Sequence, residues 1–136
     1  MLKLSKKAEY ALMAVKYIAA KQGKSCVTAK EVSEANTIPY DLLSKVLQQL
    51  VKFDIIRSYQ GVKGGYSLTR NPDKINLIDV ISAIDPDYRI TECMNGKDKN
   101  YKECSLINCC TIRNPLIKIQ RQIDKIFIET TILQII

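Results

Sequence analysis

The chain has 136 residues, 46% of them apolar and 26% charged, so it can bury one sizeable core but hardly two independent ones. Twenty-one Lys and Arg against fourteen Asp and Glu give a net charge of +7, which favours a phosphate-rich or otherwise anionic partner. The sequence contains no histidine, which excludes His-ligated metal sites and every catalytic triad built on imidazole. The chain is therefore not predicted to be an enzyme.

The N-terminal region does not predict a secretory signal or a membrane-spanning helix. Charges flank its short apolar stretches, and nowhere do about 18 uncharged apolar residues follow one another. We therefore expect a cytoplasmic protein with no membrane association. Because that compartment keeps thiols reduced, the five cysteines are predicted to be metal ligands, redox thiols or core residues rather than structural disulfides.

The first half of the chain predicts three helices. Apolar residues repeat at intervals of three and four from Ser5, a suitable N-cap, to about Gln22. Thr28 is a suitable cap for a second helix over residues 29–35. A third helix opens at Ile38 and Pro39 and carries an apolar stripe on one face as far as Val51. The pattern is that of a helix, a turn and an amphipathic helix.

A hairpin and a fourth helix follow. Residues 55–59 and 65–69 alternate like strands on either side of a basic turn that contains glycine. Asn76 then opens a helix that is predicted to end at Asp85 and Pro86. The sequence therefore predicts a mainly α fold with a small β-hairpin wing, in which residues 1–86 form a winged helix-turn-helix domain.

The remaining third of the chain divides into two predicted parts. Residues 87–112 form a polar, aperiodic, cysteine-rich loop, and a loop of that length in a compact protein is usually functional. Residues 113–136 show helical apolar spacing and a very apolar end, more than one small domain needs to bury. We interpret them as a long C-terminal dimerisation helix.

A helix-turn-helix with a basic hairpin can place its second helix in the major groove of DNA and its wing against phosphate or the minor groove. Reading two half-sites in this way needs a dimer. The predicted contacts with a double-stranded operator are Tyr40, Asp41, Ser44, Lys45 and Gln48 on the third helix, followed by Gln49, with Lys6, Lys7 and Lys30 on the first two helices and Arg57, Gln60 and Lys63 on the hairpin. The competing interpretation is an ordinary solvated face. An RNA-binding module is disfavoured, because the few aromatic residues are scattered along the chain.

Four of the five cysteines, Cys93, Cys104, Cys109 and Cys110, fall within eighteen residues. Closely spaced thiolates on a loop suit an iron-sulfur cluster, because soft sulfur ligands match iron. Zinc is an alternative, although the usual C-x-x-C spacing is missing. A third possibility is a cluster-free protein whose thiols form a disulfide on oxidation. A function as an electron-carrying iron-sulfur protein is disfavoured, because it would not explain the predicted winged helix.

The chain resembles the Rrf2 family of bacterial transcription regulators along essentially its whole length. The resemblance is carried by LSKKAEYALMAVKYIA, by VTAKEVSEANTIPYDLLSKVLQQLVKFDIIRSYQGVKGGYSL and by the late cysteines, and its most specific parts are residues 9–12, residues 61–66 and the segment from Cys110 through residues 114–116. It implies a homodimer in which each subunit contributes a winged helix and a long C-terminal helix that crosses its partner. Gln60 stands where family members often insert an arginine into the minor groove.

The resemblance also implies a cluster ligand set. Three cysteines lie between winged helix and dimer helix in cluster-binding members, which correspond here to Cys93, Cys104 and Cys110. Five residues separate Cys104 from Cys110, as in the family, whereas ten separate Cys93 from Cys104, more than in the better-known members. Arg113 stands where some members have a histidine ligand.

The fourth ligand is open. Glu9 matches the position of an acidic residue that reaches the partner subunit's cluster in other members. Cys109 is its rival, and a solvent-filled position is a further option. A 4Fe-4S cluster is slightly favoured over a 2Fe-2S cluster. The predicted function is a regulator that senses iron, redox or nitric oxide state, with a thiol-switched or zinc-stabilised regulator as the alternative.

Overall fold

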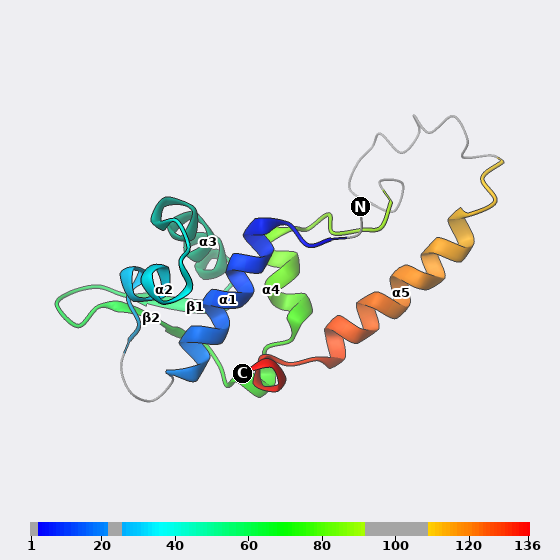
Figure 1. Ribbon diagram of the computed structural model, residues 1–136. Coiled ribbons are helices and arrows are strands. Elements are labelled where there is room, and N and C mark those ends of the chain that lie inside the picture. Colours follow the sequence, from blue (N-terminus) through cyan, green and yellow to red (C-terminus); the bar gives the residue numbers. More distant parts are fainter. Residues whose placement is uncertain (1–2, 22–25, 92–108) are drawn as a thin grey trace.

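The computed structural model describes residues 3–21, 26–91 and 109–136 (Figure 1). Its elements in chain order are α1 (Lys6–Ala20), α2 (Ala29–Asn36), α3 (Tyr40–Lys52), β1 (Ile56–Tyr59), β2 (Gly65–Leu68), the short 3-10 helix η1 (Pro72–Lys74), α4 (Leu77–Ile84), α5 (Arg113–Glu129) and the 3-10 helix η4 (Ile132–Ile135). The predicted fold class is confirmed, since helices dominate and the two strands form one small antiparallel sheet. No helix in these three ranges is both long and apolar enough to cross a membrane.

Helix α1 is the central element of the core and packs against α3 and α4. The Ser5 side chain caps it by accepting a hydrogen bond of 3.1 Å from the backbone N–H of Ala8. The buried face of α1 is rich in alanine, which lets the neighbouring helices approach closely. The core around it contains Val15, Ile18, Leu43, Leu47, Leu50, Ile55, Ile75, Val80 and Ile132.

Helices α2 and α3 form the predicted helix-turn-helix. Thr28 caps α2 through a hydrogen bond of 3.1 Å from the backbone N–H of Glu31. The turn places Thr37 in the left-handed region, at φ 54°, which is strained for a β-branched residue. Two hydrogen bonds join Ser33 to Ile38 across this turn, and the Ile38 side chain is buried. The turn is thus held by the core, and it fixes the direction in which α3 begins.

Strands β1 and β2 form the predicted hairpin, one residue shorter at an end of each strand than expected. They pair from Ile56 with Leu68 to Tyr59 with Gly65. On the other side of β2, Val27 forms a bridge with Tyr66, so the hairpin is anchored to the segment before α2. Figure 1 shows that the hairpin projects beyond α2, away from α4 and α5.

The C-terminal segment corrects one expectation. A single helix to Ile136 is wrong, because α5 ends at Glu129 and the chain continues in an extended conformation at Thr130 and Thr131. The Ile132 N–H donates to the Ile75 carbonyl at 2.8 Å, and the Ile132 side chain is fully buried. The apolar end is therefore partly used within the chain, since the core has a place for one of its isoleucines. We call residues 130–136 the C-terminal latch.

Candidate nucleic-acid interface and cysteine segment

The predicted DNA-contacting residues of α3 lie on one face of that helix. Asp41, Ser44, Lys45 and Gln48 are spaced at intervals of three and four, and all are exposed except the half-buried Ser44. Tyr40 opens the helix and is also exposed. The opposite face, with Leu43 and Leu47 among others, is buried. A helix with one anchored face and one polar exposed face can enter a major groove.

Gln49 is the exception among the residues suggested on α3. Its side-chain amide donates a hydrogen bond of 3.2 Å to the backbone carbonyl of Ala83. This contact ties α3 to α4, so Gln49 holds the helix in place rather than facing a DNA partner.

The predicted phosphate contacts are distributed over α1, α2 and the hairpin. These residues, Lys6, Lys7, Lys30, Arg57 and Lys63, are all exposed, and so is Gln60, which stands where family members often have the minor-groove arginine. Some of them also make contacts within the chain. Lys6 forms an ion pair of 2.9 Å with Glu9, and the Arg57 guanidinium donates to the Thr69 carbonyl at 3.3 Å. An exposed ion pair such as that of Lys6 contributes little to stability, so the lysine can exchange Glu9 for a phosphate at a small cost in free energy.

The predicted cluster ligands are only partly within the described residues. Cys93 and Cys104 lie outside them. Cys110 is half-buried and Cys109 is exposed, both as free thiols, just before α5. Within the described ranges no three metal-ligating side chains come together. Glu9 lies in the first turn of α1, whose start is well separated from the start of α5 in Figure 1. A Glu9 ligand would therefore have to come from the partner subunit.

Arg113 has an unusual environment in the first turn of α5. Its Nε atom is buried and has no hydrogen-bond partner among the described residues. Arg113 follows Cys110 by three residues. A buried guanidinium N–H calls for an acceptor, preferably an anionic one.

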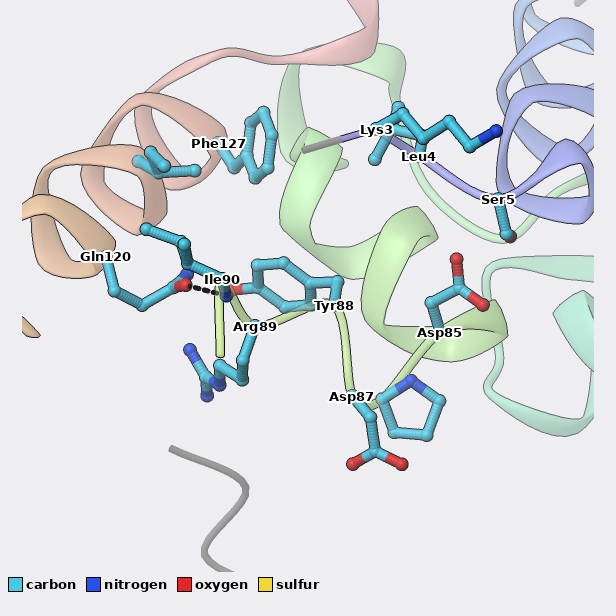
Figure 2. A pocket seen from close by; sticks show the side chains of 12 residues that line it. Lys3, Leu4, Ser5, Asp85, Asp87, Tyr88, Arg89, Ile90, Gln120 and Phe127 are labelled. Carbon is cyan, nitrogen blue, oxygen red and sulfur yellow. Dashed lines mark hydrogen bonds between the residues drawn. The ribbon is translucent and has the colours of Figure 1, made fainter. Parts of the chain in front are cut away.

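A half-buried polar network between the end of α4 and the middle of α5 was not predicted from the sequence. The Tyr88 hydroxyl donates to the Asp124 Oδ1 atom at 2.6 Å, and the Arg89 guanidinium donates to Oδ2 at 3.0 Å. Gln120 donates to Asp124 at 2.8 Å. It also accepts from the Ile90 N–H at 2.9 Å, the contact drawn in Figure 2. These contacts fix residues 88–90 on the middle of α5, and we call them the linker network. Residues 88–90 lead into the part of the sequence from Cys93 to Cys110, which we call the cysteine segment.

The linker network borders a cavity of about 560 Å³. Leu4, Ser5, Asp85, Asp87, Ile90, Ile123 and Phe127 are among the residues that line it. The Tyr88 and Phe127 rings lie 6.1 Å apart in a tilted arrangement. The polar groups of Tyr88, Arg89 and Gln120 already bond within the network, so the cavity is mostly apolar on the side of α5.

Two pKa values are perturbed in the linker network. Burial would raise the pKa of Asp124, but hydrogen bonds from Tyr88 and Gln120 and the charge of Arg89 outweigh burial and hold it below its ordinary value. Desolvation, reinforced by the hydrogen bond to Asp124, raises the pKa of Tyr88 to about 12. At neutral pH the network therefore contains a carboxylate and a neutral phenol.

The Asp124→Asn substitution is expected to lower the free energy of unfolding at pH 7 by about 1–2 kcal/mol, because it removes a charged acceptor of three hydrogen bonds. A depressed carboxyl pKa stabilises the fold above the ordinary value of 3.8, and this contribution is lost as the pH falls through the folded-state pKa. The difference between wild type and variant should therefore shrink below about pH 4. Urea denaturation at pH 7 and pH 3 measures it.

The exposed Asp73→Asn substitution is the matched control, since it makes the same chemical change outside the network. It should leave stability unchanged within about 0.5 kcal/mol at both pH values. An Asp124→Asn variant as stable as Asp73→Asn at pH 7 would show that the network does not stabilise the fold.

Helix α5 has two apolar faces. One contains Ile123 and Phe127 and faces the body of its own chain. The other is a stripe at intervals of seven, with Ile112 just before the helix 59% exposed, Ile119 46% exposed and Ile126 60% exposed. Spacing by seven is typical of a helix that packs along another helix. We call Ile112, Ile119 and Ile126 the exposed stripe.

A helix-turn-helix with one exposed polar face, followed by a projecting basic hairpin, defines a winged helix-turn-helix DNA-binding protein. Residues 4–136 match the Rrf2 family, described as "Iron-dependent Transcriptional regulator". The chain belongs to this family, and the family resemblance found in the sequence is confirmed. It is a transcriptional regulator.

Three comparisons illustrate the relationship. The chain is 32% identical over 129 residues to an HTH-type transcriptional regulator of Aquifex aeolicus, covering 93% of this chain and 86% of the other. It is 30% identical over 117 residues to the regulator NsrR of Bacillus licheniformis, covering 86% and 80%. Its fold is similar to that of CymR, the global cysteine regulator of B. subtilis, with a TM-score of 0.79, 24% identity and coverage of 99% and 96%.

Proposed function

We propose that this chain acts as a homodimer that binds operator DNA through α3 and the wing. We further propose that it senses iron, redox or nitric oxide state through an iron-sulfur cluster held by Cys93, Cys104 and Cys110. The single observation that carries the DNA-binding part is the exposed face of α3, anchored from behind by core leucines, beside a projecting basic hairpin. The net charge of +7 supports a phosphate-rich partner.

The exposed stripe supports a second copy of this chain as the partner of α5. A row of half-exposed isoleucines spaced by seven is costly to leave in water. Two such helices can cover each other's stripe in an isologous dimer. We propose that this dimer presents its two α3 helices to successive major grooves. In this arrangement, recognition of the two operator half-sites depends on dimerisation.

The cysteine segment supports an iron-dependent sensor. The family description names iron, and three thiolates are the soft ligands that an iron-sulfur cluster prefers. The buried Arg113 Nε atom, without a described partner, suits a negatively charged group in this place. Glu9 of the partner subunit or Cys109 would supply the fourth ligand. A cluster, when bound, would supply a group that reacts with oxidants or nitric oxide or responds to iron supply.

Residues of this chain position the cysteine segment relative to α5. The linker network holds the entrance of the cysteine segment on α5, and the exit of the segment leads directly into α5. A change in the cysteine segment therefore acts on the helix that is proposed to set the distance between the two α3 helices. A ligand shifts such an equilibrium only by its different affinity for the two geometries.

A thiol switch is the second candidate. It is favoured by the exposed Cys109 thiol, which is adjacent in sequence to the half-buried Cys110. Oxidation would join two thiols in a disulfide with loss of two electrons and two protons to an external oxidant. In this case no iron would be required.

Anaerobic purification followed by absorption spectroscopy and by iron, sulfide and zinc analysis tests the cluster. We expect broad absorbance at about 400 nm, with equal amounts of iron and sulfide. Cys104→Ala should abolish it, whereas the matched control Cys26→Ala, a half-buried cysteine beside the wing, should retain it. A colourless protein that also fails to take up iron and sulfide on reconstitution would leave the thiol switch or a zinc site.

A further inference from the structure

The tip of the wing carries an apolar residue at its most exposed point. The Gly64 N–H donates to the Gly61 carbonyl at 2.9 Å, so that Val62 and Lys63 are the two central residues of a tight turn. Val62 has a relative exposure of 107%, far above that of the other exposed apolar residues. Its side chain therefore contributes nothing to the packing of this chain.

The backbone holds this tip in a defined shape. Gly61 has φ 108°, a conformation that favours glycine. At Gly64 a Cβ atom would lie 2.5 Å from the Tyr59 carbonyl oxygen and 2.8 Å from that of Gly61. The turn is thus too tight for a side chain there, and the two residues between the glycines are pushed outward.

Valine is an unusual choice for such a position. Turn centres favour Gly, Pro, Asn, Asp and Ser, because these residues match the turn geometry or bond to its backbone. Single exposed apolar residues are common on protein surfaces. Val62, however, lies at the end of the element that projects from the body of the molecule, directly beside an exposed lysine (Figure 1). An apolar point flanked by a cation suits a groove with apolar walls and phosphate edges.

The DNA minor groove has this chemistry. Its walls are deoxyribose CH groups and its edges are phosphates. A·T and T·A pairs offer only acceptors at its floor, whereas G·C adds the guanine N2 amino donor. Apolar side chains are used against the minor groove by several architectural proteins. A valine over a guanine N2 group would bury a donor without an acceptor, which is unfavourable.

We propose that Val62 is a specificity-determining residue of the wing, which packs against the floor and sugar walls of the minor groove and favours A·T or T·A pairs over G·C there. The inference rests on the proposed function, because it requires that the wing meets duplex DNA. Lys63 binds the adjacent phosphates without distinguishing the pairs. Threonine at position 62 has nearly the same shape but offers a hydroxyl acceptor to guanine N2.

The test uses duplexes that the wild-type protein selects from a random-sequence pool. Each A·T pair of a selected duplex is replaced in turn by G·C and by inosine·C, which lacks the N2 amino group, and affinities are measured by fluorescence anisotropy. At the pair under each wing, G·C should lower the affinity of the wild type about tenfold, whereas inosine·C should be tolerated. Val62→Thr should show little difference between these two duplexes.

Lys63→Gln is the matched control at the neighbouring position. It should weaken binding to all duplexes alike, with a smaller dependence on salt and an unchanged preference at the wing pair. A preference that persists in Val62→Thr, or the absence of any pair at which G·C and inosine·C differ, would overturn the inference alone. A wild type that selects no duplex from the pool would overturn the proposed function and the inference with it. Equal melting temperatures of the variants and the wild type exclude misfolding.

Discussion

Replacing both Ile119 and Ile126 by aspartate is expected to prevent the proposed dimer from forming, so that the protein is a monomer, and to lower its affinity for operator DNA about 100-fold or more. Both side chains are about half exposed in the single chain and belong to the exposed stripe. Two copies that pack stripe to stripe would bury four aspartates without partners, which is strongly unfavourable. A monomer carries one α3 helix and so loses the second half-site.

Sedimentation velocity measures the oligomeric state, and fluorescence anisotropy measures the affinity. Because two added acids also repel DNA, the control must change the charge equally. Asn114→Asp combined with Lys118→Gln lowers the charge of α5 by the same two units at exposed positions away from the stripe. This control should remain a dimer with a small, salt-dependent loss of affinity. A dimeric Ile119→Asp/Ile126→Asp variant would contradict the proposed interface.

The Ile132→Ala substitution is expected to lower the free energy of unfolding by about 3 kcal/mol. Ile132 is fully buried against the core of the winged helix and brings the C-terminal latch into place. Truncating it removes apolar contacts and leaves a cavity between the latch and α1. Urea denaturation at a fixed protein concentration measures the loss, since the proposed dimerisation would make the apparent stability depend on concentration.

Ile128→Ala is the matched control for this prediction. It makes the same chemical change on α5, but Ile128 is 51% exposed and lies off the exposed stripe. It should change the free energy of unfolding by less than about 1 kcal/mol. Similar losses in the two variants would show that the latch does not anchor the tail to the core.

Local signals made most of the winged helix predictable. Ser5 and Thr28 are strong N-caps because their side chains satisfy the first free N–H groups of a helix, and both cap the helices expected. The pattern of α3 could be predicted because apolar residues at intervals of three and four must face a core. The glycines between the two strands indicated the turn of the wing.

Contacts distant in sequence could not be predicted. The apolar end of the chain indicated side chains that must be buried. Nothing in the local sequence shows whether Ile132 packs against a partner helix or against the core of its own chain. Nothing in the local sequence distinguishes Asp124 from a surface acid, and only the fold brings Tyr88 to it from 36 residues away. One signal of the network was present in the sequence. Gln120 occupies a position between Leu116 and Ile123 where the helical spacing of apolar residues calls for another apolar side chain.

The two candidate sites also differ in how far they could be predicted from local sequence. Exposure of the α3 face agrees with the predicted DNA contacts, because polar residues on an amphipathic helix face away from the core. The cluster ligands depend on how one long polar segment folds and on a second subunit, neither of which periodicity can indicate. Their assignment to Cys93, Cys104, Cys110 and Glu9 remains a prediction.

In the proposed function, the state of the cysteine segment controls the binding of duplex DNA. The most direct test of this control is the affinity of anaerobically purified protein for a selected duplex, measured by fluorescence anisotropy before and after removal of iron by a chelator or exposure to nitric oxide. We expect the two affinities to differ about tenfold or more, and Cys110→Ala to bind equally with and without treatment. Equal affinities of the wild type before and after each treatment, despite a bound cluster, would show that the cysteine segment does not control DNA binding.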